Sequence, residues 1–119
     1  MKLVPHIKIW LSTADDQNII GSGRCRLLKA IDEHGSLSAA AQHLDISYRK
    51  AWGDLKKAER HIGKKLLIKS RGGSGGGKTV LTQEGIKLLK AYTELVDDVE
   101  KYAVESYAKL MEGFVDENF

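Results

Sequence analysis

A long helical repeat in the C-terminal third of the sequence constrains the fold more than any other feature. Between residues 82 and 114 apolar side chains recur every three or four positions, and no proline or glycine interrupts the run between Gly85 and Gly113. This spacing predicts one amphipathic helix of about 30 residues, or about 45 Å at 1.5 Å per residue. The apolar positions are Ile86, Leu89, Tyr92, Val96, Val99, Ala103, Tyr107, Leu110 and Phe114.

Such a helix is too long for the rest of the chain to cover. The chain has 119 residues, which suits one domain, and the remainder would fold to a body about 25–30 Å across. The helix must then project, and folding back would need a break that the sequence does not offer. Because monomers rarely keep a large exposed apolar stripe, we expect a homodimer built on this helix. The expected dimerisation residues are Tyr92, Val96, Val99, Ala103, Tyr107 and Leu110.

Three short helices with tight turns are predicted in the middle of the chain. Leucine and isoleucine at helical spacing mark the first, and Gly35 suits its C-terminal end. Ser36 or Ser38 can cap a short alanine-rich second helix. Ser47 caps the third helix, and Gly63 ends it. The expected buried face of the third helix is Ala51, Leu55, Ala58 and Ile62.

Short strands are predicted on both sides of these helices. The alternation in His6–Leu11 predicts a strand, and Ile19-Ile20 offers a second arm for a small hairpin. Residues 66–70 and 79–82 predict two strands around a glycine-rich tip, which is typical of a hairpin. Trp10 is expected in the core.

The order of these elements is that of a winged helix-turn-helix. The predicted fold is mainly α with small β, with a winged helix-turn-helix and an N-terminal strand or hairpin over residues 1–82. A long dimerisation helix and a short acidic tail follow over residues 83–119. In this fold the first turn of the third helix faces outward, where it can meet base edges and phosphates.

Positive charge is concentrated in the predicted third helix and hairpin. Residues 48–80 hold ten basic and two acidic side chains, whereas residues 1–47 are neutral and residues 81–119 hold four basic and nine acidic ones. A solvated lysine-rich face explains this block, and so does a polyanion partner, most often nucleic acid. A module that binds an acidic protein is the alternative.

The candidate residues for binding double-stranded DNA lie in and around this basic segment. Tyr48, Arg49 and Lys50 are expected to read the major groove, and serines to donate to phosphates. Trp52 suits either the core or DNA. The full set is Ser36, Ser38, Ser47, Tyr48, Arg49, Lys50, Trp52, Lys56, Lys69, Arg71, Gly75 and Lys78.

Four segments carry a family resemblance: Gly35–Ala41, Ser47–Trp52, Gly72–Gly77 and Leu81–Gly85. They resemble the DNA-binding domain of the ModE family of molybdate-responsive transcription regulators. The more distant LysR-type regulators share the Ala-Ala helix and the Leu-Thr-x-x-Gly start of the long helix. The resemblance implies a sequence-specific transcription regulator, and a dimer of it should bind an inverted-repeat operator.

The molybdate-binding domain of that family follows the part that this chain resembles. We therefore expect no molybdate binding by this chain. A truncated chain, a naturally short regulator and one half of a two-chain system each account for the length.

Other chemistry finds less support in the sequence. The run Gly72-x-x-x-x-Gly77-Lys78-Thr79 matches a phosphate-binding loop, but a strand rather than a helix is predicted at Lys78 and Thr79, so we expect no enzyme. The four histidines and one cysteine show no metal-ligand spacing, so no metal or cofactor is expected. No apolar run suits a membrane span or a signal peptide, and the lone cysteine favours a reducing cytoplasm.

Overall fold

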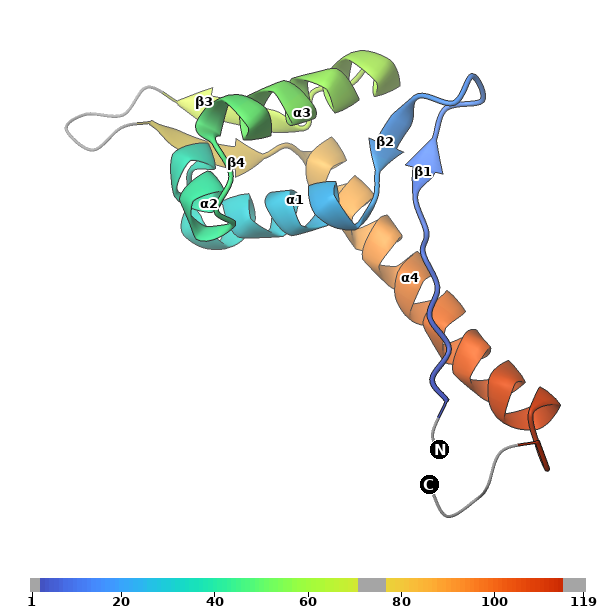
Figure 1. Cartoon of the computed structure of the whole chain (residues 1–119). Coiled ribbons are helices and arrows are strands. Elements are labelled where there is room, and N and C mark those ends of the chain that lie inside the picture. The colour runs from blue at the N-terminus through green and yellow to red at the C-terminus, as the bar shows by residue number, and fades with distance from the viewer. Residues whose placement is uncertain (1–2, 71–76, 115–119) are drawn as a thin grey trace.

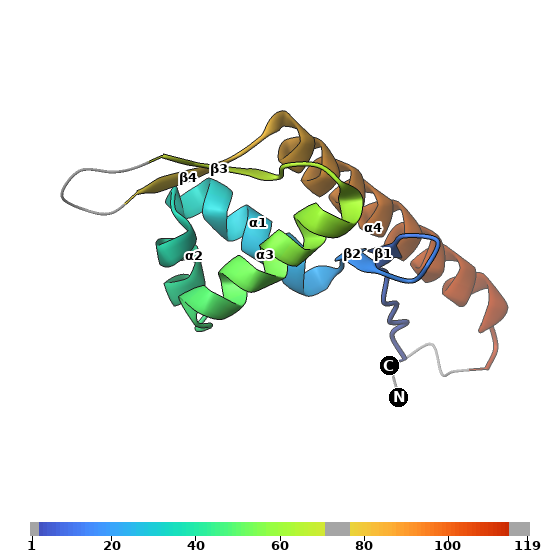
Figure 2. The same cartoon turned by 90° about the horizontal axis from the view of Figure 1, so that it is seen from above.

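Eight helices and strands follow one another in the computed structural model, which describes residues 3–70 and 77–114. In chain order they are β1 (Leu11–Ser12), β2 (Asn18–Ile20), α1 (Ser22–His34), α2 (Leu37–His43), α3 (Tyr48–Ile62), β3 (Leu67–Ser70), β4 (Lys78–Leu81) and α4 (Gln83–Leu110). The β3–β4 hairpin, which we call the wing, and the far end of α4 lie at opposite ends of the molecule (Figure 1, Figure 2). The predicted mainly α, winged helix-turn-helix fold is confirmed.

Local signals set the ends of the short helices. The side-chain oxygens of Ser36 and Ser47 cap α2 and α3, and each accepts a hydrogen bond from the backbone N–H three residues on, at 2.9 and 3.0 Å. Gly35 and Gly63 end α1 and α3 with φ of 78° and 72°, a region that glycine enters without steric strain. All four ends are where the sequence predicted them.

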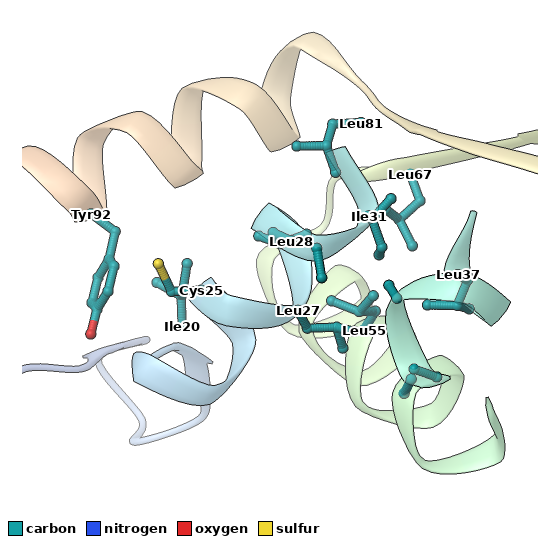
Figure 3. Close-up of a cluster of buried hydrophobic side chains, with 14 of the residues drawn as sticks. Ile20, Cys25, Leu27, Leu28, Ile31, Leu37, Leu55, Leu67, Leu81 and Tyr92 are labelled. Carbon is teal, nitrogen blue, oxygen red and sulfur yellow. The ribbon is translucent and has the colours of Figure 1, made fainter. Parts of the chain in front are cut away.

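The hydrophobic core lies where α1, α2 and α3 meet, and the wing and α4 close it (Figure 3). On α3 the predicted face is confirmed: Ala51, Leu55 and Ala58 are buried, and Ile62 is half-buried. On α2, Ala40 and Ala41 are buried, which allows this short helix to pack closely on its neighbours. The large side chains with the least exposure are Ile20, Leu27, Leu28, Ile31, Leu37, Leu55, Leu66 and Thr79.

The wing is an antiparallel pair that is anchored to the turn between α1 and α2. Leu67 lies opposite Leu81, and both side chains are buried. Thr79 is only 1% exposed: its hydroxyl oxygen accepts a bond from Leu37 N at 3.0 Å, and its own N–H donates to Gly35 O at 2.9 Å. These two bonds fix the wing beside the helix-turn-helix.

The long helix begins at a tight junction with the wing. The Thr82 hydroxyl accepts a bond from Gly85 N at 3.0 Å and donates to Lys65 O at 2.7 Å. The helix then runs for 28 residues, about 42 Å. The radius of gyration is 18.2 Å, against about 13.5 Å for a compact chain of this length. The prediction that this helix projects beyond the body is therefore confirmed (Figure 1).

The N-terminal segment differs from the prediction. Instead of a strand over His6–Leu11, only Leu11–Ser12 pairs with β2, because β2 is three residues long and offers no further partner. Residues before β1 approach α4 instead, where the Tyr92 hydroxyl donates to Ile9 O at 2.8 Å. Trp10 is 56% exposed, so its predicted place in the core is wrong. The extended backbone places Ile9 and Leu11 against the core and Trp10 outside.

Candidate nucleic-acid interface

The first turn of α3 is an exposed cationic end of a helix. Tyr48, Arg49 and Lys50 are all exposed, and Tyr48 retains 43% of its accessible surface. Ser47 uses its hydroxyl oxygen to cap Lys50 N, which leaves the hydroxyl hydrogen free to donate. Because the positive end of the helix dipole lies here too, this turn favours a bound anion.

A shallow hollow between α2 and α3 brings further polar groups to this end. It is lined by Ser38, Gln42, Asp45, Ser47 and Tyr48, together with Ala41 and Ile46. The structure thus places the predicted Ser38 and Ser47 together. Gln42 was missed by the sequence analysis, although it lies one helical turn after Ser38 on the same face of α2. An exposed amide beside the first turn of α3 can donate to a phosphate or to a base edge.

Aromatic rings join the wing to α3. The ammonium of Lys69 lies 5.0 Å from the ring centroid of Tyr48 and 4.5 Å from that of Trp52, and it donates a hydrogen bond to the Tyr48 hydroxyl. The ammonium of Lys56 lies 4.5 Å from the same Trp52 ring. Four predicted site residues from α3 and β3 are therefore in contact with one another.

A buried carboxylate that the sequence analysis missed supports this arrangement. Glu59 is 7% exposed; its Oε2 accepts bonds from Leu66 N at 2.7 Å and Leu67 N at 3.2 Å, and its Oε1 pairs with Lys56 Nζ at 3.1 Å. Burial acts to raise the pKa of Glu59, but the bonds from Leu66 N, Lys56 and Leu67 N outweigh it and the pKa is lowered. The charged carboxylate thereby fixes the start of β3 against α3.

The remaining wing candidates lie along the hairpin. Lys78 is exposed and lies opposite Ser70 in the β3–β4 register. Lys78 and Thr79 belong to β4, and the next helix starts at Gln83, so the glycine-rich motif does not lead into a helix as a phosphate-binding loop does. Arg71 and Gly75 lie outside the described residues.

Most cations near this end have no acidic partner. Within residues 3–70 and 77–114 only two ion pairs form, Arg24 with Asp54 and Lys56 with Glu59. Arg24 is buried and also donates to the carbonyls of Asn18 and Ile19, so it joins α1, β2 and α3 rather than facing a ligand. Arg49 and Lys50 in the first turn of α3, and Lys69 and Lys78 in the wing, are therefore among the cations without an acidic partner in the described residues.

Comparison with known proteins places this arrangement in a family. The model of the bacterial regulatory helix-turn-helix proteins of the lysR family matches residues 23–86, from the first turn of α1 to the first turn of α4. The chain belongs to this family. The matched LysR-family segment holds every candidate DNA-binding residue named above.

Relatives include the proteins that the motifs indicated. The chain is 37% identical over 82 residues to the molybdenum-pterin-binding protein MopB of Rhodobacter capsulatus, and 36% identical over 80 residues to the transcriptional regulator ModE of Haemophilus influenzae. These matches cover 69% and 67% of this chain but only 30% and 31% of those proteins. The predicted resemblance to the ModE group is confirmed. Among solved structures, ArgP of Mycobacterium tuberculosis matches with a TM-score of 0.48 at 26% identity, covering 73% of this chain and 29% of ArgP.

The residues of α4 that were predicted to form a dimer contact fall into two groups, which differ in their exposure to solvent. Tyr92 is 4% exposed and points from α4 toward Cys25 and Ile20 (Figure 3), so it belongs to the core of its own chain and its side chain offers no surface for a dimer contact. Burial, with a smaller effect from Cys25, raises the pKa of the Tyr92 hydroxyl. Farther along α4, Leu110 is 78% exposed. The half-buried positions between them are Val96, Val99, Ala103 and Tyr107.

We also searched the described part of the chain for a metal site and for a membrane-spanning helix. Three or more potential metal ligands do not come together there. None of the described helices is long and apolar enough to cross a membrane.

Proposed function

We propose that this chain binds double-stranded DNA with sequence preference and serves as the DNA-binding part of a transcription regulator. One observation supports this most: the exposed cationic turn Tyr48–Lys50 lies beside the wing, in a LysR-family helix-turn-helix, without acidic partners among the described residues. The chain spans about 30% of the length of the relatives it matches, so the remaining functions of those proteins are not carried over. As a regulator it would act on the chromosome, in the cytoplasm.

The candidate residues divide by the part of the duplex they would meet. Tyr48, Arg49 and Lys50 enter the major groove, where an arginine can bind both acceptors of a guanine. Ser36, Ser38 and Ser47 donate to phosphates from the N-terminal ends of α2 and α3. Lysines of α3 and the wing bind the backbone or the minor groove. These are Lys56, Lys69 and Lys78, together with Arg71 and Gly75. Trp52, the remaining residue of the predicted set, lies between the major-groove residues and these lysines on α3.

Selection from random duplexes at moderate salt tests this proposal. We expect an enriched sequence, and Arg49→Ala to lose about 1–3 kcal/mol of binding and relax base preference at one position. Lys78→Ala should weaken binding to every sequence alike, whereas Lys90→Ala, an exposed position on α4, should change nothing. Failure to enrich any sequence would refute sequence-specific binding, and binding to an acidic protein would then be the hypothesis to test.

We also propose that the chain acts as a homodimer through the far half of α4. Tyr102, Leu110 and Phe114 are 70–78% exposed, and the half-buried valines continue the apolar surface beside them. Burying such a surface against a second copy is the common solution in oligomers. Two winged helix-turn-helix domains would then bind half-sites about 34 Å apart, or a multiple of that distance, in an inverted repeat.

Sedimentation at micromolar concentration measures the assembly state. We expect twice the chain mass of 13.2 kDa, and Leu110→Glu or Val99→Glu to shift the protein toward the single chain and weaken DNA binding. A species of 13.2 kDa whose DNA affinity neither substitution changes would refute the dimer.

A further inference from the structure

Two lysine ammonium groups share one indole ring at the junction of α3 and the wing. The side chains of Lys56 and Lys69 come from different elements, yet each Nζ lies 4.5 Å from the centroid of the Trp52 ring. Like charges at one ring repel, so other contacts must hold them there. Glu59 pairs with Lys56 at 3.1 Å, and the Tyr48 hydroxyl accepts a bond from Lys69.

The indole itself is fixed by the body of the protein. Trp52 is half-buried and packs against the hydrophobic core, so its ring has fewer alternative positions than the exposed side chains around it. An indole face attracts a cation more strongly than any other side-chain ring does. Trp52 can thus restrict two long side chains that would otherwise sample many rotamers.

Restricting these lysines matters for binding a polyanion. A lysine that is already held near its binding position loses less conformational entropy when it meets a phosphate. Both ammonium groups lie on the face of α3 that the wing flanks, the same face that carries Tyr48 in the first turn. Each of the two ammonium groups also lies 4.5 Å from the centroid of the Trp52 ring.

From this geometry we propose that Trp52 is a positioning residue for phosphate binding. It holds Lys56 of α3 and Lys69 of the wing in one fixed arrangement, so that both ammonium groups meet the same stretch of DNA backbone. Trp52 contributes through the two lysines and makes no contact with bases. This inference rests on the proposed DNA-binding function.

The first test uses NMR to measure, in the protein without DNA, whether the two lysine side chains lie over the Trp52 ring. Protons on the Cε atoms of lysines held over an aromatic ring shift upfield in NMR spectra. We expect this shift for Lys56 and Lys69, its loss in Trp52→Leu and its retention in Trp52→Phe. Circular dichroism and thermal unfolding show whether each variant is folded. Unshifted Cε protons in the folded wild-type protein would overturn the inference.

The second test measures the salt dependence of binding to a mixed-sequence duplex. Log K falls with log salt, and each phosphate contact adds about 0.9 to the magnitude of this slope, so loss of both contacts lowers the magnitude by about 1.8. We expect Trp52→Leu to lower the slope toward this limit without changing base preference, and Trp52→Phe to restore it. In a Lys56→Gln, Lys69→Gln background, Trp52→Leu should have no further effect.

The outcomes separate the two proposals. An unchanged slope in Trp52→Leu, a changed base preference, or further weakening in the double-glutamine background would overturn the positioning role and leave DNA binding intact. The last two results would instead indicate direct contact with DNA or a purely structural role. If the wild-type chain binds no duplex, the proposed function fails, and the phosphate role of the lysines fails with it.

Discussion

Replacing Glu59 should loosen the wing from α3 and lower the free energy of unfolding. Its carboxylate accepts bonds from the buried N–H groups of Leu66 and Leu67, at 2.7 and 3.2 Å. A buried donor left without a partner costs about 1–3 kcal/mol, so the loss of both acceptor contacts in Glu59→Ala should destabilise the fold by about 2–6 kcal/mol. The ion pair with Lys56 adds little, because 34% of that lysine side chain is exposed. Against a total stability of about 5–15 kcal/mol this is a large fraction.

The conservative variant isolates the charge. Glu59→Gln keeps one side-chain oxygen as acceptor and loses the charge, so we expect a smaller destabilisation of about 1–2 kcal/mol at neutral pH. Urea unfolding followed by circular dichroism measures both variants. Glu94→Gln, at an exposed position on α4, is the matched control and should change the free energy of unfolding by less than about 0.5 kcal/mol.

The same comparison has a defined pH dependence. The pKa of Glu59 is lowered below its ordinary value of 4.5 in the folded protein. The contribution of the Glu59 carboxylate to the free energy of unfolding is therefore complete above its pKa in the unfolded chain. This contribution is lost as the pH falls through its pKa in the folded protein. The difference between wild type and Glu59→Gln should shrink as pH falls below 4.5. A difference under about 0.5 kcal/mol at neutral pH, or one that grows in acid, would refute the role of this carboxylate.

Three further predictions concern Thr79 of the wing, the glycines Gly85 and Gly53, and the binding of molybdate. Thr79→Val should cost about 1–3 kcal/mol in urea unfolding because it leaves the buried Leu37 N–H without its acceptor, and an unchanged midpoint would contradict this. Gly85→Ala should destabilise the fold by about 1–3 kcal/mol, because a Cβ there would lie 2.4 Å from Leu66 O. Gly53→Ala lies in open space on α3 and should stabilise the fold by about 0.5–1 kcal/mol. A higher melting temperature for Gly85→Ala than for Gly53→Ala would refute the packing argument. Isothermal calorimetry with molybdate at micromolar protein should give no heat of tight binding, and a clear binding isotherm would disprove that expectation.

The sequence predicted which side chains would lie in the exposed turn of the candidate site, but it did not predict the residues that hold this turn and the wing in place. The exposed turn from Tyr48 to Lys50 follows from the Ser47 cap, which is a signal within four residues of sequence. The role of Glu59 was not predicted, because an acidic side chain in a basic segment carries no local signature. The role of Gln42 was not predicted either, although its spacing from Ser38 places both on one face of α2. Tyr92 was assigned to a dimer contact because helical spacing shows that a side chain is on the apolar stripe, not which partner covers it.

The sequence by itself determined the helices, their ends and the long projecting α4. Serine caps, left-handed glycines and apolar spacing act over three or four residues, so the chain carries them wherever it folds. Only the tertiary structure decided how distant segments meet. Tyr92 lies 83 residues from Ile9, Lys69 lies 21 residues from Tyr48, and Arg24 lies 30 residues from Asp54. These contacts form because packing the core brings the N-terminal segment, α3 and the wing together, and buried polar groups must then find partners across that packing.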